Sequence, residues 1–479
     1  MLAPMQIFMD NAPLLNTDET PRAAPAVVRP VTRPNGWLRH ASAVIPSASR
    51  LMTVGYSLAD QALAVGGMFL VNVMLARTRT KEEYGIFALS YSLFTFLAGV
   101  HNASILEPFT VYGSGRYRDR FPEYLRLMTR ANVLLGLLLS GVLVLTCLGL
   151  WWMAPQFASL ALLGLGLTVG LQLSGLFLRR TFYVQRQPAF AAKSSLVFFV
   201  TVALGLWLAV RAQVLNTLSA FLVLALAWIV AGACFARKLP FGRTQVTFLE
   251  LEPGYWRVHW KYARWVLSTA FVFQLMTQGY FWLVAGLLSV KEVGELRAMY
   301  NLIAPVDQVI VALSFLVLPA MASHYAMKRM GHLLSLWKRY VLAVLGVTAL
   351  FALSLRILGQ QVMHLLYAGK FDALGPLLFA LALLPVLTAM GTTMSQALSA
   401  VEKPKLVFYS YVTSGAATFA LGIPLVIHFG LRGAVYGMLL SAAAFNFALG
   451  LGFLVAVFEK ARRQTADMRL HSVRGEARR

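Results

Sequence analysis

Long apolar stretches alternate with short polar connections along most of the chain. Runs such as 133–150, 160–178 and 342–355 approach or reach the roughly 18 to 20 residues that cross the hydrocarbon core of a bilayer. A hydropathy window of that length predicts twelve membrane-spanning helices. Their ranges are 52–76, 84–106, 131–153, 158–178, 190–210, 214–236, 265–289, 296–321, 340–358, 374–399, 406–428 and 433–457.

The composition supports the bilayer as the solvent of this chain. Of 479 residues, 58% are hydrophobic and 13% are charged, whereas about a quarter of the residues in a soluble domain are charged. That is too little charge to cover a soluble surface. We therefore predict an all-α polytopic membrane protein with about 12 transmembrane helices in two six-helix bundles.

The basic residues are unevenly distributed along the chain. A net charge of +23 would by itself suit nucleic-acid binding. Most of the 42 lysines and arginines, however, fall on the two tails and on alternate connections, which share one side of the membrane. The positive-inside rule assigns that side to the cytoplasm. We therefore expect cytoplasmic termini and contacts with membrane lipids, and we do not expect a nucleic-acid partner.

This topology divides the chain into five parts. They are a basic cytoplasmic tail at 1–50 that we expect to be disordered, an amino-terminal six-helix bundle at 51–236, a cytoplasmic or interfacial linker at 237–264, a carboxyl-terminal six-helix bundle at 265–458 and a basic cytoplasmic tail at 459–479. A weak repeat relates the two bundles, because four residues recur with the same spacing and order. The first copy is Glu83, Gly85, Tyr91 and Leu93, and the second is Glu292, Gly294, Tyr300 and Leu302. Such a parallel repeat is found in several transporter architectures.

Polar residues inside the spans mark the candidate functional site, because ionisable groups in a membrane usually face a bundle interior or an aqueous cavity. In the eighth span, Arg297 and Asp307 lie near one helical face, and Asp307 is about 15 Å further along the axis, near the membrane middle. The candidate residues from the first, second, seventh and eighth spans are Asp60, Gln61, Tyr91, Asn102, Gln274, Gln278, Arg297, Asn301, Asp307 and Gln308. These spans correspond between the two halves, so we expect a polar cleft between them.

Two other interpretations of these residues stay open. The polar groups could hold helices together, since interhelical hydrogen bonds contribute about 0.6 kcal/mol each. Asp60 or Asp307 could also be a partner in a buried ion pair.

Catalytic motifs are lacking. The sequence contains no Walker phosphate loop, zinc-binding histidine pair or nucleophile elbow. The largest predicted cytoplasmic connection, 237–264, is too short for a nucleotide-binding domain. We therefore expect a protein that is not an enzyme and has no cofactor. Coupling of transport to H⁺ or Na⁺ is compatible with the sequence. Any transport would use an ion gradient, the membrane potential or the substrate gradient.

Six short motifs, in their order and spacing, carry a resemblance to a known family. They are Ala-Asp-Gln-Ala-Leu at 59–63, Leu-Ala-Arg at 75–77 with Lys-Glu-Glu-Tyr-Gly-Ile-Phe-Ala-Leu at 81–89, Val-Gly-Glu-Leu-Arg-Ala at 293–298, Leu-Tyr-Ala-Gly-Lys-Phe at 366–371, Ala-Val-Glu-Lys-Pro at 400–404 and Gly-Leu-Arg-Gly-Ala-Val-Tyr-Gly at 430–437. With these motifs the chain resembles the polysaccharide transporter family of the multidrug, oligosaccharidyl-lipid and polysaccharide exporter superfamily.

The resemblance implies two six-helix bundles in a V around a cavity that opens alternately to each side. It implies that the chain flips lipid-linked oligosaccharide or exports polysaccharide across the bacterial inner membrane, for cell-surface lipopolysaccharide or exopolysaccharide synthesis. The substrate would be a polyprenyl-diphosphate-linked glycan, and a glycan polymerase or export machinery a partner. Arg297 and Arg264 would bind the diphosphate, because arginine matches phosphate oxygens. Asp60 and Asp307 would bind sugar hydroxyls or a coupling cation.

The charged residues deep inside the predicted spans differ from those of this family, whose cavity is often more cationic. Here they include two acids and a single well-placed arginine. This departure keeps a cation-coupled multidrug extruder of the same superfamily as the first alternative. A second alternative is a non-transporting membrane scaffold of a glycan-assembly complex.

Overall fold

A computed structural model describes residues 48–151, 156–241, 254–327, 329–401 and 403–476. These residues form helices joined by short turns, and no strand occurs among them. Nearly all of the amino-terminal tail predicted at 1–50 lies outside the described residues. The prediction of an all-α polytopic membrane protein is confirmed.

The amino-terminal half contains the six predicted spans. A π-helical turn at Asn102–Leu106 joins α2 to α3, so these two helices form one span. The helices are α1 (Ala48–Thr78), α2 (Lys81–His101), α3 (Glu107–Ser114), α4 (Phe121–Leu150), α5 (Gln156–Val184), α6 (Pro188–Arg211) and α7 (Thr217–Phe235).

The carboxyl-terminal half has helices over the other six predicted ranges. A second π-helical turn, at Thr418–Gly422, joins α13 to α14, and the backbone of α14 breaks at Gly430, whose φ is +57°. The last two spans therefore lie on either side of Gly430. The helices are α8 (Tyr255–Leu287), α9 (Val290–Ala326), α10 (Met330–Tyr367), α11 (Gly375–Ala382), α12 (Leu384–Ala400), α13 (Pro404–Ala417) and α14 (Ile423–Glu476).

Ten stretches of these helices are long and apolar enough to cross a membrane. One of them, Lys405–Val455, contains both of the last two predicted spans, and α9 is not among the ten. The helix boundaries differ from the predicted ones in several places, and three of these differences change the predicted division of the chain. Helix α5 continues to Val184, so Arg179 and Arg180 lie inside it and not in a connection; α8 already begins inside the predicted linker; and α14 continues into the predicted carboxyl-terminal tail.

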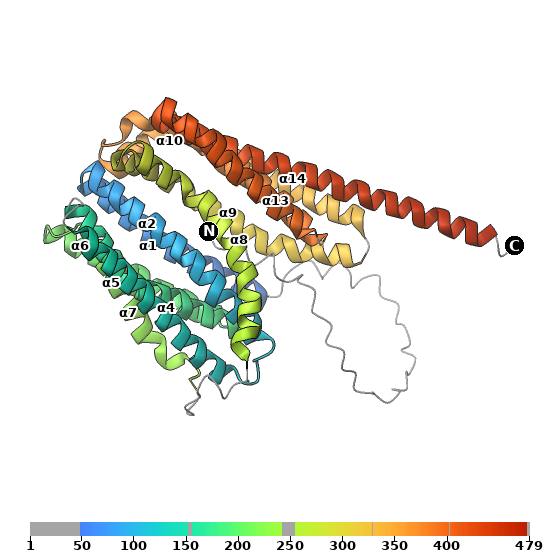
Figure 1. The fold of residues 1–479 in the computed structure, drawn as a ribbon, viewed down its shortest axis with the longest axis horizontal. Coiled ribbons are helices and arrows are strands. Elements are labelled where there is room, and N and C mark those ends of the chain that lie inside the picture. Colours follow the sequence, from blue (N-terminus) through green and yellow to red (C-terminus); the bar gives the residue numbers. More distant parts are fainter. Residues whose placement is uncertain (1–47, 152–155, 242–253, 328, 402, 477–479) are drawn as a thin grey trace.

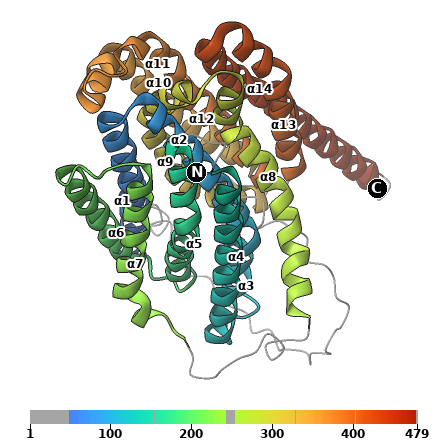
Figure 2. The same cartoon turned by 60° about the vertical axis from the view of Figure 1, so that its left-hand side comes forward.

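The two halves meet at one end and diverge towards the other (Figures 1 and 2). The apolar cores show the same arrangement. One continuous cluster of buried side chains unites the halves where α1 ends and α9 begins, and it includes Leu75, Phe87, Val293 and Phe371. Farther along, the buried side chains form one cluster around Tyr124, mostly from the amino-terminal half with Tyr255 of α8, and another around Tyr340 in the carboxyl-terminal half. Helix α8 stays packed against the amino-terminal half there, since Val266 and Ala270 form a small buried cluster with Ala103. We call these two ends the meeting end and the diverging end.

Candidate functional site

Arg297 lies at the contact between the two halves. Its side chain is 9% exposed, and its Nε donates to Oδ1 of Asn72 in α1 at 3.3 Å. The guanidinium lies 4.5 Å from the ring centroid of Tyr91 and 5.5 Å from that of Phe281. Such cation–π contacts are attractive, and more so away from water. Arg297 and Tyr91, both predicted site residues, are thus brought together, and they fill the contact between the halves.

The amide residues of α8 also face the amino-terminal half. Nε2 of the buried Gln274 donates to the carbonyl oxygen of Thr95 in α2 at 2.9 Å. Nearby, Trp282 donates from Nε1 to Oγ of Ser92 at 2.8 Å. These bonds hold α8 along α2, as the interpretation of the polar residues as helix contacts predicts. One buried amide atom in each of Gln278, Asn301 and Gln308 has no hydrogen-bond partner among the described residues.

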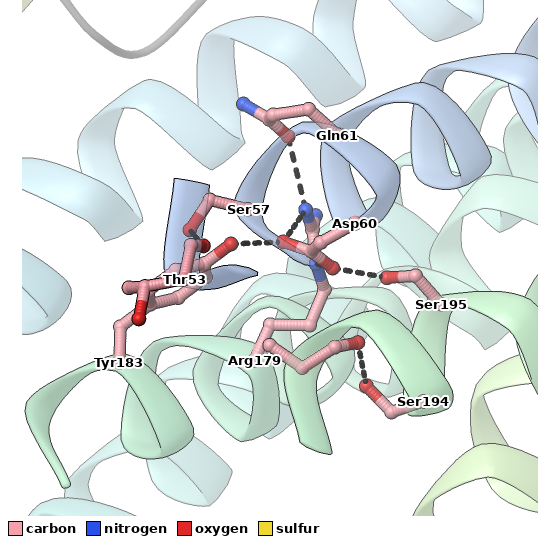
Figure 3. A network of polar contacts seen from close by, with 9 residues as sticks. Thr53, Ser57, Asp60, Gln61, Arg179, Tyr183, Ser194 and Ser195 are labelled. Atoms are coloured by element: carbon pink, nitrogen blue, oxygen red, sulfur yellow. Dashed lines mark hydrogen bonds and ion pairs between the residues drawn. The ribbon is translucent and has the colours of Figure 1, made fainter. Parts of the chain in front are cut away.

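Asp60 is a partner in a buried ion pair inside the amino-terminal half (Figure 3). Its carboxylate is fully buried and accepts from Nε and Nη2 of Arg179 in α5, at 2.9 and 2.6 Å. It also accepts from the hydroxyls of Tyr183 and Ser195, at 2.7 and 2.5 Å. Arg179 donates as well to Oε1 of Gln61 at 2.9 Å. These contacts satisfy the buried charge, so Asp60 and Gln61 bridge α1 to α5 and α6.

A second arginine of α5 meets the π-helical turn that follows α2. Nη2 of Arg180 donates to Oδ1 of the buried Asn102 at 3.2 Å. The neighbouring His101 is fully buried and contacts Oδ1 of Asn132 through Nε2 at 2.7 Å. A histidine of α8, His259, contacts the carbonyl oxygen of Ser104 in the same turn at 2.8 Å. The irregular backbone therefore receives side chains from two other helices.

Asp307 lines a cavity of about 200 Å³ inside the carboxyl-terminal half. It is the only acidic residue in the cavity wall, and no hydrogen bond or ion pair of its carboxylate occurs in the described part of the chain. The wall is otherwise aromatic, apolar and hydroxyl-bearing. It includes Phe273, Met276, Tyr280, Tyr300, Tyr411, Ser414, Thr418, Ser441 and Phe445. The Tyr280 and Ser441 hydroxyls are hydrogen-bonded at 2.9 Å, and Thr418 donates to Ser441 at 3.0 Å.

The predicted residues therefore fall into separate groups. Asp60 belongs to the amino-terminal half, Arg297 to the contact between the halves and Asp307 to a cavity in the carboxyl-terminal half. Arg264 is exposed on α8, with its guanidinium 5.9 Å from the centroid of Trp265, apart from these groups. Asn72, the partner of Arg297, is not among the predicted site residues. Arg179 directly follows the span predicted at 158–178, but α5 continues through it to Val184.

Comparisons with solved structures show a common architecture. An inward-facing structure of a multidrug resistance MATE family transporter of the MOP superfamily matches with a TM-score of 0.71 and 12% identity, over 85% of this chain and 96% of that one. The chain has the fold of MOP superfamily transporters. An outward-facing MATE structure matches with a TM-score of 0.64 and 12% identity, over 86% of this chain and 96% of the other.

The same fold includes a flippase. The lipid II flippase MurJ, in an inward closed conformation, matches with a TM-score of 0.64 and 15% identity, over 83% of this chain and 87% of that one. No protein-family model matches the sequence, and no curated protein matches it either. The matched structures are those of transporters and of a flippase.

Proposed function

We propose that this chain moves lipid-linked oligosaccharide across the bacterial inner membrane by alternating access. The observation that carries the proposal is the arrangement of the buried cores: one large core unites the halves at the meeting end, whereas at the diverging end the two main cores lie apart and α8 packs against the amino-terminal half. Two bundles packed in this way can rock about their contact and expose a path to either side. The larger TM-score with the inward-facing MATE structure supports a diverging end that faces the cytoplasm.

The charge of the diverging end supports an anionic substrate. By the positive-inside rule this end faces the cytoplasm, with both chain termini on that side. Arg126, near the start of α4, has buried Nε and Nη2 atoms without a hydrogen-bond partner among the described residues. Guanidinium groups bind phosphate oxygens through two parallel hydrogen bonds. A polyprenyl-diphosphate-linked glycan would thus enter from the cytoplasmic leaflet, where the sugars are attached to the lipid. A glycan polymerase would use the glycan on the other side of the membrane.

Reconstituted protein tests this proposal. Vesicles that contain a fluorescent polyprenyl-diphosphate saccharide report how much of the lipid moves between leaflets. We expect movement with the parent protein and at least a tenfold slower rate with Arg126→Ala, because a charge-assisted contact to phosphate contributes about 1.5–3 kcal/mol. Arg118→Ala is the matched control, since Arg118 is exposed near the same end. No movement above that of protein-free vesicles would contradict the proposal.

The cavity around Asp307 favours a second candidate function, a cation-coupled extruder of amphipathic compounds. A carboxylate among aromatic rings suits an organic cation, through charge and cation–π attraction. It also suits H⁺ or Na⁺, whose release could accompany substrate binding. Efflux of a fluorescent organic cation from intact cells separates the two functions. Efflux that requires Asp307, with no movement of the saccharide lipid, would favour the extruder.

A further inference from the structure

We propose that residues 367–371, the turn after α10, form a clasp that holds the two bundles together at the meeting end. The clasp belongs to the carboxyl-terminal half, and its Lys370 and Phe371 contact the amino-terminal half. It contains most of the motif Leu-Tyr-Ala-Gly-Lys-Phe, to which the proposed function gives no role. The clasp concerns closure of the meeting end and does not depend on the identity of the substrate.

Lys370 binds the carboxyl end of α1. Its Nζ donates to the carbonyl oxygens of Ala76 and Arg77, at 3.0 and 3.1 Å, and also to that of Arg79. The last carbonyls of a helix lack partners within it and carry a partial negative charge. The pKa of Lys370 is lowered mainly by partial burial and, to a smaller extent, by the nearby Lys81 ammonium. Because an ammonium has three donors, the three carbonyls can together compensate its lost hydration.

Phe371 fills the seam beside α2. Its ring is fully buried and packs edge-on against Tyr84, with 6.2 Å between the ring centroids. Nζ of Lys81 lies 5.2 Å from the centroid of the same ring. Lys81 in turn forms an ion pair with Glu295 of α9 at 2.8 Å. An apolar ring and an ion pair between the halves therefore lie side by side.

The backbone of the clasp turns so that these two side chains reach the amino-terminal half. Ala368 and Gly369 both have positive φ, at +52° and +81°, which reverses the chain directly after α10. Tyr367 anchors the reversal to its own half, because its hydroxyl donates to the carbonyl oxygen of Ala298 at 2.9 Å. Arg77 of the amino-terminal half also contacts the other half, because its Nη1 donates to the carbonyl oxygen of Leu365 in α10 at 3.3 Å.

Opening of the meeting end requires Lys370 to leave all three carbonyls at once. The clasp therefore sets the population in which this end is open. Distances between spin labels at Glu82 in α2 and Gln361 in α10, both exposed, measure that population in nanodiscs. We expect Lys370→Met to raise the share of the longer distance about tenfold, since hydrogen bonds to a charged group are worth about 1.5–3 kcal/mol.

Three further variants complete the test, each made with both native cysteines replaced by serine. Lys370→Ala should act like Lys370→Met, and Phe371→Leu should act in the same direction, less strongly. Lys291→Ala should leave the distances unchanged, because Lys291 is an exposed lysine at the same end of the molecule. Unchanged distances in both Lys370 variants, with intact melting curves, would overturn the clasp. So would an equal shift in Lys291→Ala.

Discussion

Gly85 of α2 and Gly294 of α9 lie backbone against backbone at the meeting end. A Cβ on Gly85 would lie 1.7 Å from the carbonyl oxygen of Val290, and one on Gly294 would lie 2.6 Å from that of Lys81. The two glycines occupy equivalent positions in the sequence repeat. The two copies of the sequence repeat therefore contact each other where the two bundles meet, as expected of halves related by an approximate two-fold axis.

This close approach predicts that Gly85→Ala destabilises the protein. The carbonyl oxygen in its way belongs to helix backbone, which cannot turn aside as a flexible side chain can, so α2 and α9 must separate. Overpacking of this kind typically costs about 1–3 kcal/mol. Thermal unfolding in detergent measures the loss. Gly286→Ala is the control, because nothing lies within 4 Å of a Cβ there, and equal melting of both variants would refute the explanation.

Asp60→Asn should destabilise the amino-terminal bundle by about 3–5 kcal/mol, because it leaves the largely buried Arg179, whose side chain is 13% exposed, without a counter-ion. The double variant Asp60→Asn with Arg179→Met should recover part of that loss, since no unpaired charge stays behind. Thermal unfolding of the parent, the two single variants and the double variant gives the coupling energy. If Asp60→Asn unfolds like the parent but loses transport, Asp60 binds an ion during transport and is not needed for the structure.

Arg297→Ala should lower stability far more than Arg264→Ala. The first removes a buried cation from its contacts with Asn72 and Tyr91, whereas the second removes an exposed side chain, and such surface changes usually stay within about 0.5 kcal/mol. Parallel melting curves of the two variants check this difference. A similar, small effect of both would mean that Arg297 is not needed for the contact between the halves.

Asp307→Asn should leave stability within about 0.5 kcal/mol of the parent, since its carboxylate has no partner among the described residues. Under the proposal that Asp307 takes part in transport, the same variant should slow transport at least about tenfold. Melting and vesicle flux on one preparation measure both quantities. A strongly destabilised variant would instead show that Asp307 has a structural role.

Most of the fold follows from hydropathy, because each span must bury about twenty residues in lipid whatever its neighbours are. The twelve predicted ranges each contain a helix. The ends were less predictable, since a helix can continue beyond the apolar run wherever a neighbouring helix pairs its charges. Arg179 is such a case, because Asp60 in another span allows it to lie inside the helix.

The candidate site was less predictable than the fold. A polar residue inside a span marks a position that needs a partner, but the sequence does not say which helix supplies it. Asp60 and Arg297 are both candidate cavity residues by sequence, and in the structure each has a partner from a distant segment, Arg179 and Asn72 respectively. Asp307 lines a cavity that lies within one half and not between the two.

The leaflet distribution of lipid-linked saccharide in cells tests the central claim most directly. A deletion strain should accumulate the saccharide lipid on the cytoplasmic leaflet, the parent gene should clear it, and Arg126→Ala should clear it at least about tenfold more slowly at equal expression. An unchanged amount and leaflet distribution of that lipid in the deletion strain would contradict saccharide-lipid transport and leave efflux of amphipathic cations as the function to test.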